Sequence, residues 1–300
     1  MTLPPGQAPS NAAPLEAPAC PLCGSAEGGA LVRQIDPYAV RRCACGLLFL
    51  SPRLAESAMR EDYERLDYFE GGGTGYASYA AQEATLRSTF RGLLRGMRRH
   101  GLTGGRLLEV GCAYGYFLEE AQGSFSHRAG TDYSPEALAR ASGRADALIL
   151  GGPSDVPREP FDCAACIHVI EHVYDPVPWL VEIRERLRPG GWLVLATPDA
   201  GSRWRPLMRS RWPFYKVPEH VTYFDRSSMT RLMLAAGFEA VRSLPYPSIF
   251  PLGLAVQKLG ASLPQALARL PVRLPGATLC LAARRPEAGA TGPRLHAVRS

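Results

Sequence analysis

Small and acidic residues recur at alternate positions near the middle of the chain, where they could hold a nucleotide. The apolar run 106–110 carries a carboxylate and is followed by a small-residue turn; the set is Glu109, Gly111, Ala113 and Gly115. The run predicts a buried parallel strand, and the apolar-periodic segment 116–122 predicts a helix after the turn. Glycines in such a corner let the backbone approach a ligand closely. We therefore predict that strand, turn and helix together form a nucleotide-binding corner.

A second carboxylate, Asp132, lies seventeen residues after Gly115, at the end of the apolar stretch 128–131. A carboxylate at this place can accept hydrogen bonds from both hydroxyls of a ribose. The turn opens with an acid and does not follow the G-x-G-x-x-G pattern that binds a pyrophosphate. A Rossmann-type corner that binds NAD is the alternative interpretation.

The spacing of these acids and glycines resembles that of the class I S-adenosylmethionine (SAM) methyltransferases. In that family the first-strand acid and the glycine turn hold the methionine half of SAM, and the second-strand acid holds its ribose. The resemblance implies a doubly wound α/β fold with a mostly parallel, seven-stranded, Rossmann-like sheet. It also implies that SAM contacts Glu109, the three small turn residues and Asp132.

A later part of the chain follows the same family pattern. The buried-strand pattern 161–167 is followed by His168, and a helix at 179–187 precedes an apolar strand, 192–198, that ends in Thr-Pro. Open parallel sheets bind ligands at the carboxyl ends of their strands, so we expect His168 to face the cofactor pocket. The segment 277–283 is predicted to be the last strand, at the edge of the sheet.

Glu171 and His172 follow His168 closely and have two interpretations. Residues three and four apart share a helix face, so these three side chains could bind a divalent cation. Alternatively, they anchor the start of the helix and pack the loop. One carboxylate with two imidazoles is a poor magnesium site, which favours the anchoring interpretation.

Four cysteines near the N-terminus are spaced as two pairs, Cys20 with Cys23 and Cys43 with Cys45. Four thiolates carried on two turns suit a tetrahedral zinc ion, and such a closed site supports the fold without taking part in catalysis. The second pair is one residue narrower than the usual C-x-x-C. Four free cysteines are the alternative.

The Pro-Glu-His segment after the fifth strand carries the predicted catalytic residues. The imidazole of His220 titrates near neutrality, and the adjacent carboxylate of Glu219 could orient it. We predict His220 as general base, assisted by Glu219 or Tyr223. The alternative is a buried histidine that holds this insertion in place.

A glycine-rich loop at 68–76 is predicted to close over cofactor and substrate, with Tyr76 at the cofactor, although a plain linker is the alternative. The apolar insertion near the C-terminus could cover a hydrophobic substrate, another subunit or a membrane surface, or pack on its own core.

The predicted organisation is a disordered tail (1–18), a zinc-ribbon-like module (19–54), a helical lid or linker (55–100), a methyltransferase core (101–285) with insertions at 199–225 and 245–275, and a disordered tail (286–300).

The charge pattern argues against a nucleic-acid surface. The net charge of +6 comes almost wholly from arginine, because Lys216 and Lys258 are the only lysines, and no run of five basic residues occurs. The N-terminus has no signal-peptide pattern, and no apolar stretch is long enough to span a membrane. These features predict a cytoplasmic protein with reduced thiols, for which peripheral membrane contact stays open.

As a whole, residues 20–285 resemble bacterial SAM-dependent methyltransferases with an N-terminal zinc-binding segment, some of which act in sugar and natural-product pathways. The resemblance implies methyl transfer to an oxygen or carbon of a small molecule or saccharide. One alternative is an RNA ribose or carbon methyltransferase that grips RNA with the zinc ribbon. Another is a non-catalytic SAM-binding adapter. The oligomeric state is not predicted.

Overall fold

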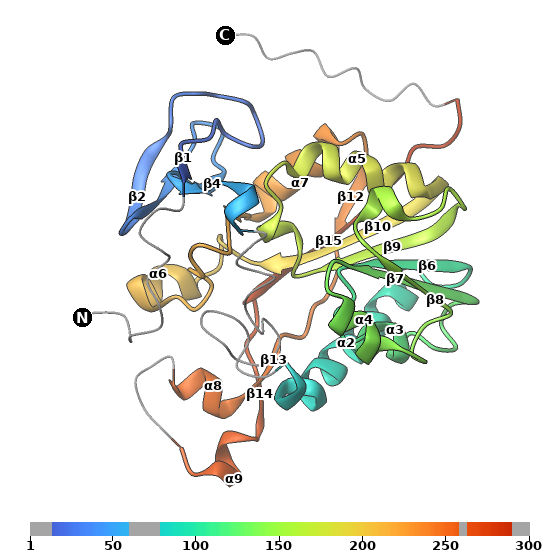
Figure 1. The fold of residues 1–300 in the computed structure, drawn as a ribbon. Coiled ribbons are helices and arrows are strands. Elements are labelled where there is room, and N and C mark those ends of the chain that lie inside the picture. The colour runs from blue at the N-terminus through green and yellow to red at the C-terminus, as the bar shows by residue number, and fades with distance from the viewer. Residues whose placement is uncertain (1–13, 60–78, 258–262, 290–300) are drawn as a thin grey trace.

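A central seven-stranded sheet organises the computed structural model, which describes residues 14–59, 79–257 and 263–289 (Figure 1). The strands lie in the order β12-β15-β10-β9-β6-β7-β8. Their bounds are β6 Arg106–Val110, β7 His127–Asp132, β8 Ala147–Leu150, β9 Phe161–Ile167, β10 Leu187–Pro198, β12 Glu239–Ser243 and β15 Thr278–Arg284.

Five neighbouring strands, β8, β7, β6, β9 and β10, run parallel, and β15 runs antiparallel to both β10 and β12. This arrangement confirms the doubly wound, mostly parallel α/β fold. The prediction that the strand at 277–283 lies at the edge was wrong, because β15 lies between β10 and β12. All of its residues except Arg284 are buried, as expected for a strand covered on both faces.

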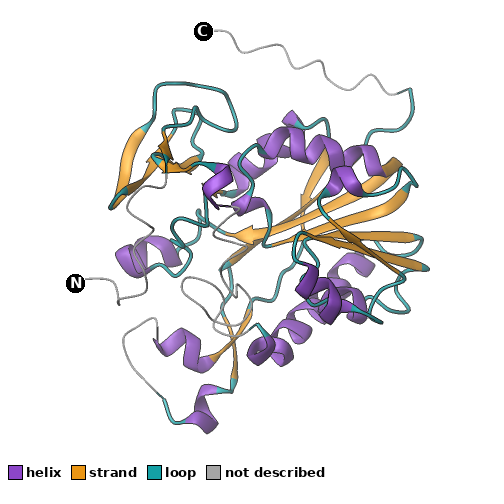
Figure 2. Cartoon of the chain, in the orientation of Figure 1, coloured by secondary structure: helices purple, strands orange, loops and turns teal. Residues whose placement is uncertain are grey.

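Helices cover both faces of the sheet (Figure 2). Helices α5 and α7 lie on one face and pack with apolar residues of the first core, including Leu180, Ile183 and Leu232. Helices α2, α3 and α4 lie on the other face, where Phe90 and Phe117 belong to a second core. The bounds are α2 Glu83–Arg99, α3 Tyr116–Glu120, α4 Pro135–Ala141, α5 Pro176–Arg186 and α7 Arg226–Ala235, with one-turn 3-10 helices η1 Ala80–Gln82, η2 Pro153–Asp155 and η3 Ile170–His172.

The N-terminal residues form a small four-stranded sheet in the order β11-β4-β3-β2. Strand β11 of this sheet comes from the predicted insertion 199–225. The zinc-ribbon-like module and that insertion, which the sequence analysis treated as separate, therefore share one sheet. Its bounds are β2 Ala30–Ile35, β3 Tyr38–Arg42, β4 Leu48–Leu50 and β11 Thr222–Tyr223. The same insertion contains α6 Trp204–Met208 and the 3-10 helix η4 Arg209–Arg211.

Part of the N-terminal segment predicted to be disordered is ordered. Strand β1, Leu15–Glu16, pairs antiparallel with β5, Arg53–Leu54. Arg53 is buried, and its guanidinium bonds Glu16 at 2.7 Å and lies 4.2 Å from the ring centroid of Tyr174. These contacts hold residues 15 and 16 on the core, so the prediction of disorder was wrong for this part of 1–18.

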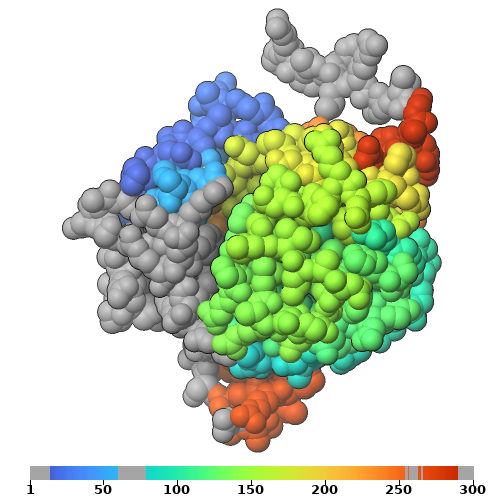
Figure 3. Space-filling view, turned by 45° about the vertical axis from the view of Figure 1, so that its right-hand side comes forward, coloured from blue at the N-terminus to red at the C-terminus, as the bar shows by residue number. Residues whose placement is uncertain are grey.

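The C-terminal insertion is a hairpin with two short helices, β13 Ile249–Pro251, α8 Leu252–Gln257, α9 Gln265–Ala268 and β14 Pro271–Arg273. It packs against α2, where the backbone amide of Ile249 donates to Thr89 Oγ1 at 3.2 Å. Its far end protrudes at the bottom of the space-filling view (Figure 3), and Leu267 and Leu270 are about half exposed there. The insertion therefore packs on its own domain through α2, and part of its apolar surface is exposed.

The predicted helix at 79–100 is present as η1 and α2. The glycine-rich loop before it, with Tyr76, lies outside the described residues, as do 1–13 and 290–300. Within the described ranges, every helix is too short or too polar to cross a membrane.

Candidate functional site

The turn after β6 adopts the left-handed backbone that its small residues allow. Gly111, Ala113 and Gly115 have φ angles of 75°, 47° and 72°. A Cβ on Gly111 would lie 2.4 Å from Val169 Cγ2, so only glycine lets the turn sit against the loop after β9. The turn therefore presents backbone, not side chains, at the carboxyl edge of the sheet.

Asp132 lies beside this turn, because β6 and β7 pair in register with Val110 opposite Thr131. One carboxylate oxygen accepts the backbone amide of Ala113 and the other that of Ser134, both at 2.9 Å. Burial raises the pKa of Asp132, and these amide hydrogen bonds act in the opposite direction. The carboxylate is thus fixed between the glycine turn and the start of α4.

Glu109 is fully buried beneath the turn, and its Oε2 atom has no hydrogen-bond partner among the described residues. Burial, and then the charge of Asp132, raise the pKa of Glu109 well above its ordinary value. An unpaired buried carboxyl is costly unless a partner arrives. A cationic ligand group at this position would satisfy it.

This burial predicts a pH effect on stability. Because the folded chain holds the Glu109 proton more tightly than the unfolded chain, the contribution of Glu109 is full below pH 4.5 and is lost as pH rises toward the raised pKa. Glutamine cannot ionise, so Glu109→Gln does not lose this stability as the pH rises. Without cofactor, we therefore expect the Tm of the variant minus the Tm of wild type to be larger at pH 8 than at pH 5. Thermal melts at both pH values test this, with the exposed Glu136→Gln as control. A pH-independent difference would contradict it.

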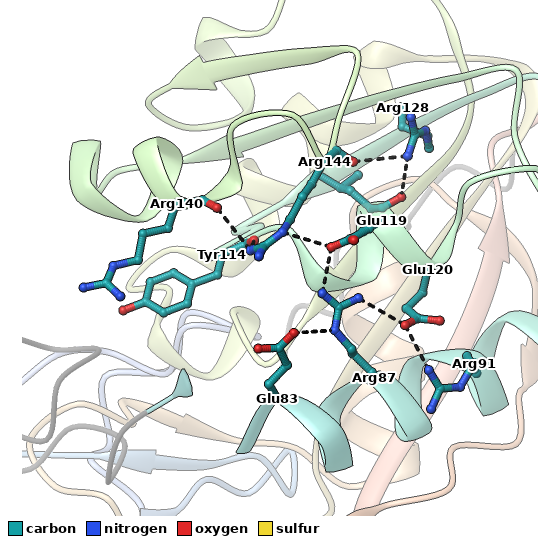
Figure 4. A network of polar contacts seen from close by, with 10 residues as sticks. Glu83, Arg87, Arg91, Tyr114, Glu119, Glu120, Arg128, Arg140 and Arg144 are labelled. Atoms are coloured by element: carbon teal, nitrogen blue, oxygen red, sulfur yellow. Dashed lines mark hydrogen bonds and ion pairs between the residues drawn. The ribbon is translucent and has the colours of Figure 1, made fainter. Parts of the chain in front are cut away.

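Ion pairs brace the helices that flank the turn (Figure 4). Arg87 of α2 bonds Glu119 at 2.7 Å and Glu120 at 3.2 Å, both on α3. Arg144, beyond α4, bonds Glu119 at 2.9 Å and donates to the backbone carbonyl of Tyr114 at 2.6 Å. The Tyr114 carbonyl within the turn is therefore held by the side chain of Arg144, which Glu119 holds in place in turn.

The Gly111 contact yields a stability prediction. Gly111→Ala places a Cβ against Val169 and imposes left-handed strain, so we expect a destabilisation of about 2–3 kcal/mol. Gly123→Ala is the matched control, since Gly123 has φ 74° but no atom lies within 4 Å of the position that its Cβ would take. Urea unfolding of both variants separates clash from strain. Equal losses would show that the Val169 contact is unimportant.

His168 follows β9 directly and has a left-handed backbone, with φ 57°. Its Nδ1 lies 3.2 Å from Glu171 Oε1, and Thr197 Oγ1 donates to Glu171 Oε2 at 2.8 Å. Burial alone would raise the pKa of Glu171, but the hydrogen bond from His168 and the nearby imidazoles lower it to about 2. Glu171 is therefore a buried, ionised carboxylate with hydrogen bonds at both oxygens.

His220, the predicted general base, is buried behind this group. Its Nδ1 bonds the carbonyl of Phe214 at 2.9 Å, so Phe214, and not Glu219 as expected, orients the ring. The ring packs edge-on against His172, with centroids 4.7 Å apart. Burial, and then the neighbouring His172, lower the pKa of His220 well below its ordinary value. A neutral, enclosed imidazole favours the alternative in which His220 holds the insertion in place.

Glu171, His172 and His220 bring potential metal-ligating atoms within 4.8 Å of one another. Because Glu171 already accepts a hydrogen bond at each oxygen, these contacts favour the anchoring interpretation over a cation site. Glu219 is buried nearby; neither of its carboxylate oxygens has a hydrogen-bond partner among the described residues, and Lys216 Nζ lies 3.7 Å away.

Tyr223, the third predicted catalytic residue, is buried in β11. Its hydroxyl lacks a hydrogen-bond partner in the described part of the chain, and burial raises its pKa. With Arg42 and Arg205, it lines a small hollow to which no residue of the glycine turn contributes. The structure therefore does not bring Tyr223 together with the residues predicted to hold the cofactor.

The four N-terminal cysteines converge at one point. Cys20 and Cys45 have their sulfurs 3.6 Å apart, Cys23 and Cys43 3.5 Å apart, and all four lie within 4.8 Å of one another. Tetrahedral zinc with Zn–S bonds of about 2.3 Å requires sulfurs roughly 3.8 Å apart. The spacing matches a zinc site with four thiolate ligands, and the narrow second pair does not prevent it.

Comparison with known proteins places this geometry in a family. Residues 41–243 match the model of a methyltransferase domain, which is more than half of the chain. The chain belongs to this methyltransferase family. The glycine turn, both acids and the strand-end histidine lie inside the matched region, whereas Cys20 and Cys23 lie before it.

Curated relatives match only parts of this chain. A ubiquinone biosynthesis O-methyltransferase of Paraburkholderia phymatum is 34% identical over 109 residues, which cover 32% of this chain and 45% of that protein. An uncharacterised 37.1 kDa protein in transposon TN4556 of Streptomyces fradiae is 32% identical over 165 residues, or 48% of this chain and 46% of that protein. The chain thus spans less than half the length of these relatives.

Solved structures share the fold. A SAM-dependent methyltransferase of Thermotoga maritima, described as a possible histamine N-methyltransferase, has a TM-score of 0.50 and 19% identity, covering 75% of this chain and 95% of that one. The 1,6-didemethyltoxoflavin-N1-methyltransferase of Burkholderia thailandensis has a TM-score of 0.50 and 16% identity, covering 86% and 100%. At these identities the likeness shows the Rossmann-like methyltransferase fold alone.

Sequence reasoning missed two features of the site. It did not connect Thr197, seen only as part of a Thr-Pro strand ending, to Glu171, which it left as either an anchor or a ligand. It also did not place Val169 against Gly111. The three-residue spacing of His168 and Glu171 indicated that these two side chains could meet. Only the fold shows that the neighbouring strand β10 supplies Thr197 as a further partner of Glu171.

Proposed function

We propose that this protein transfers a methyl group from SAM to an oxygen or carbon of a small molecule. The observation that carries the proposal is a pair of acids, the buried Glu109 and the partly buried Asp132, at neighbouring strand ends on either side of a turn made of backbone. A sulfonium nucleoside has an ammonium at one end and ribose hydroxyls at the other, so two acids separated by a smooth turn complement it. Family membership supports the same reaction.

The described residues fit SAM at one tested point. The unpaired Glu109 Oε2 atom offers an acceptor for the amino group of SAM. We propose that Asp132 binds the ribose of SAM and that Gly111, Ala113 and Gly115 form the floor of the SAM pocket. SAM supplies an electrophilic methyl group when bound; this chain's residues position it and exclude water.

We propose that Cys20, Cys23, Cys43 and Cys45 bind one structural zinc ion. The close approach of the four sulfurs supports this, as do the two turns that carry them: Gly24 N donates to Cys20 O and Gly46 N to Cys43 O, both at 2.8 Å. The ion would fasten the small sheet, and through β11 it would also fasten the segment around His220.

For the substrate we propose a sugar, saccharide or natural-product intermediate, handled in the cytoplasm. The O-methyltransferase name of the relatives supports an oxygen acceptor on a small molecule. Tyr76 stays a predicted cofactor contact, and His220, Glu219 and Tyr223 stay predicted contributors to catalysis. No finding favours the RNA or the adapter alternative over this assignment.

A labelled-methyl assay tests the proposal. The full chain is incubated with methyl-labelled SAM and a panel of nucleotide sugars, lipid-linked saccharides, catechols and RNA. We expect transfer to a small-molecule hydroxyl or carbon, and loss of transfer in Asp132→Ala. Transfer to RNA alone would replace the substrate proposal, and absence of any transfer by a chain that binds SAM would favour the adapter.

A further inference from the structure

We propose that His168 is the general base for a hydroxyl acceptor, positioned by Glu171 and Thr197. The inference rests on the proposed function and names the proton-accepting residue of that site. It assigns catalysis to a residue that the sequence placed only among cofactor contacts.

The three residues form a hydrogen-bonded relay across two strands. Thr197, at the end of β10, donates to Glu171 Oε2 at 2.8 Å, and Glu171 Oε1 lies 3.2 Å from His168 Nδ1. In the neutral imidazole this contact holds the proton on Nδ1, which leaves Nε2 as the acceptor. A buried carboxylate that fixes one tautomer of a histidine is the arrangement that prepares an imidazole for proton removal.

His168 occupies the place where a substrate must meet the cofactor. It follows β9, which pairs directly with β6, and the next residue, Val169, packs against Gly111 of the cofactor turn. On another side its ring lies edge-on to Tyr246, with centroids 6.0 Å apart. Tyr246 belongs to the C-terminal insertion, so His168 sits between the predicted cofactor turn and a segment that could hold a substrate.

Access and backbone conformation distinguish His168 from His220. Its side chain is 21% exposed, whereas His220 is 4% exposed. Its left-handed φ of 57° is unusual for a residue with a Cβ, and Ala113 of the cofactor turn shares this conformation. Such strain persists where surrounding contacts hold a side chain in a required direction.

The proposed step balances as follows. His168 Nε2 accepts the proton of the acceptor hydroxyl as the acceptor oxygen forms its bond to the methyl carbon. The sulfur–carbon bond breaks, and its electron pair stays on sulfur, which becomes a neutral thioether. Glu171 stabilises the resulting imidazolium, and the proton then passes to solvent through the exposed edge of the ring.

The first test reads the tautomer and needs no substrate. Nitrogen NMR of the full chain labelled at histidine, with S-adenosylhomocysteine as the probe, is assigned with His168→Gln. We expect neutral His168 to carry its proton on Nδ1. A proton on Nε2 would overturn the proposal, because that nitrogen could not then accept one.

The second test uses the acceptor found by the labelled-methyl assay. We expect His168→Gln to lower kcat about 100-fold or more and to abolish the acid limb of the pH profile of kcat/KM, with SAM affinity changed less than threefold. Glu171→Gln should lower kcat at least about tenfold. His127→Gln, at the opposite end of β7 from Asp132, is the matched control and should behave as wild type.

The outcomes separate the two proposals. Wild-type kcat in His168→Gln would overturn the base assignment while methyl transfer stands. If SAM binds and no acceptor is methylated, the proposed function fails, and the NMR tautomer still decides whether the relay exists.

Discussion

Replacing Asp132 by alanine is expected to weaken SAM binding by a factor on the order of 100 or more. Hydrogen bonds to a charged group contribute about 1.5–3 kcal/mol each, and the ribose offers two hydroxyls to this carboxylate. The substitution also releases the amides of Ala113 and Ser134, which the carboxylate holds at 2.9 Å. Isothermal titration calorimetry with the full chain measures the change.

Asp146→Ala is the control for this variant. Asp146 also accepts a backbone amide near β7, that of Arg128 at 2.7 Å, but at the end of the strand opposite to Asp132. It should bind SAM as wild type does. Equal weakening in both variants would mean that Asp132 acts only on the stability of β7, and the ribose assignment would be lost.

The second large effect concerns the cysteine cluster. Cys43→Ala is expected to remove the zinc ion and to lower the Tm by roughly 10 °C, because structural zinc sites supply several kcal/mol of folding free energy. The damage should reach beyond the small sheet. Leu50 N donates to Val221 O and Val221 N to Glu171 O, each at 2.9 Å, so a line of backbone hydrogen bonds runs from β4 to the relay.

Metal analysis and thermal melts test this together. Wild type should contain one zinc ion per chain, as should Cys163→Ala, a control that removes a buried core cysteine outside the cluster. A zinc-free wild type with full stability would contradict the structural-zinc proposal. A second ion that survives in Cys43→Ala would indicate that Glu171, His172 and His220 bind metal after all.

The sequence was a sound guide where local pattern and fold agree. The run at 106–110 and the alternating small residues after it predicted a buried strand and a tight turn, since a buried strand interior and a left-handed backbone each demand particular residue types. The position of Asp132 at the end of the next strand could also be predicted from local pattern. Its distance from Gly115 is set by one helix and one strand of ordinary length.

Contacts between distant segments were not predictable in this way. Strand β11 has two residues, too few to show alternation, and its pairing with β4 depends on a loop crossing that no local pattern encodes. The same holds for the contact between Thr197, at the end of β10, and Glu171, in η3 after the neighbouring strand β9. His220 looked like a base because of its neighbour Glu219, yet the fold turns its Nδ1 to the Phe214 carbonyl and buries the ring.

Titration of the purified full chain with SAM addresses the central claim most directly. Two acids around a glycine turn, Glu109 and Asp132, predict saturable binding of one SAM per chain, with an affinity that falls when Asp132 is removed. A folded sample that takes up no SAM, under conditions where circular dichroism confirms its secondary structure, would contradict the account.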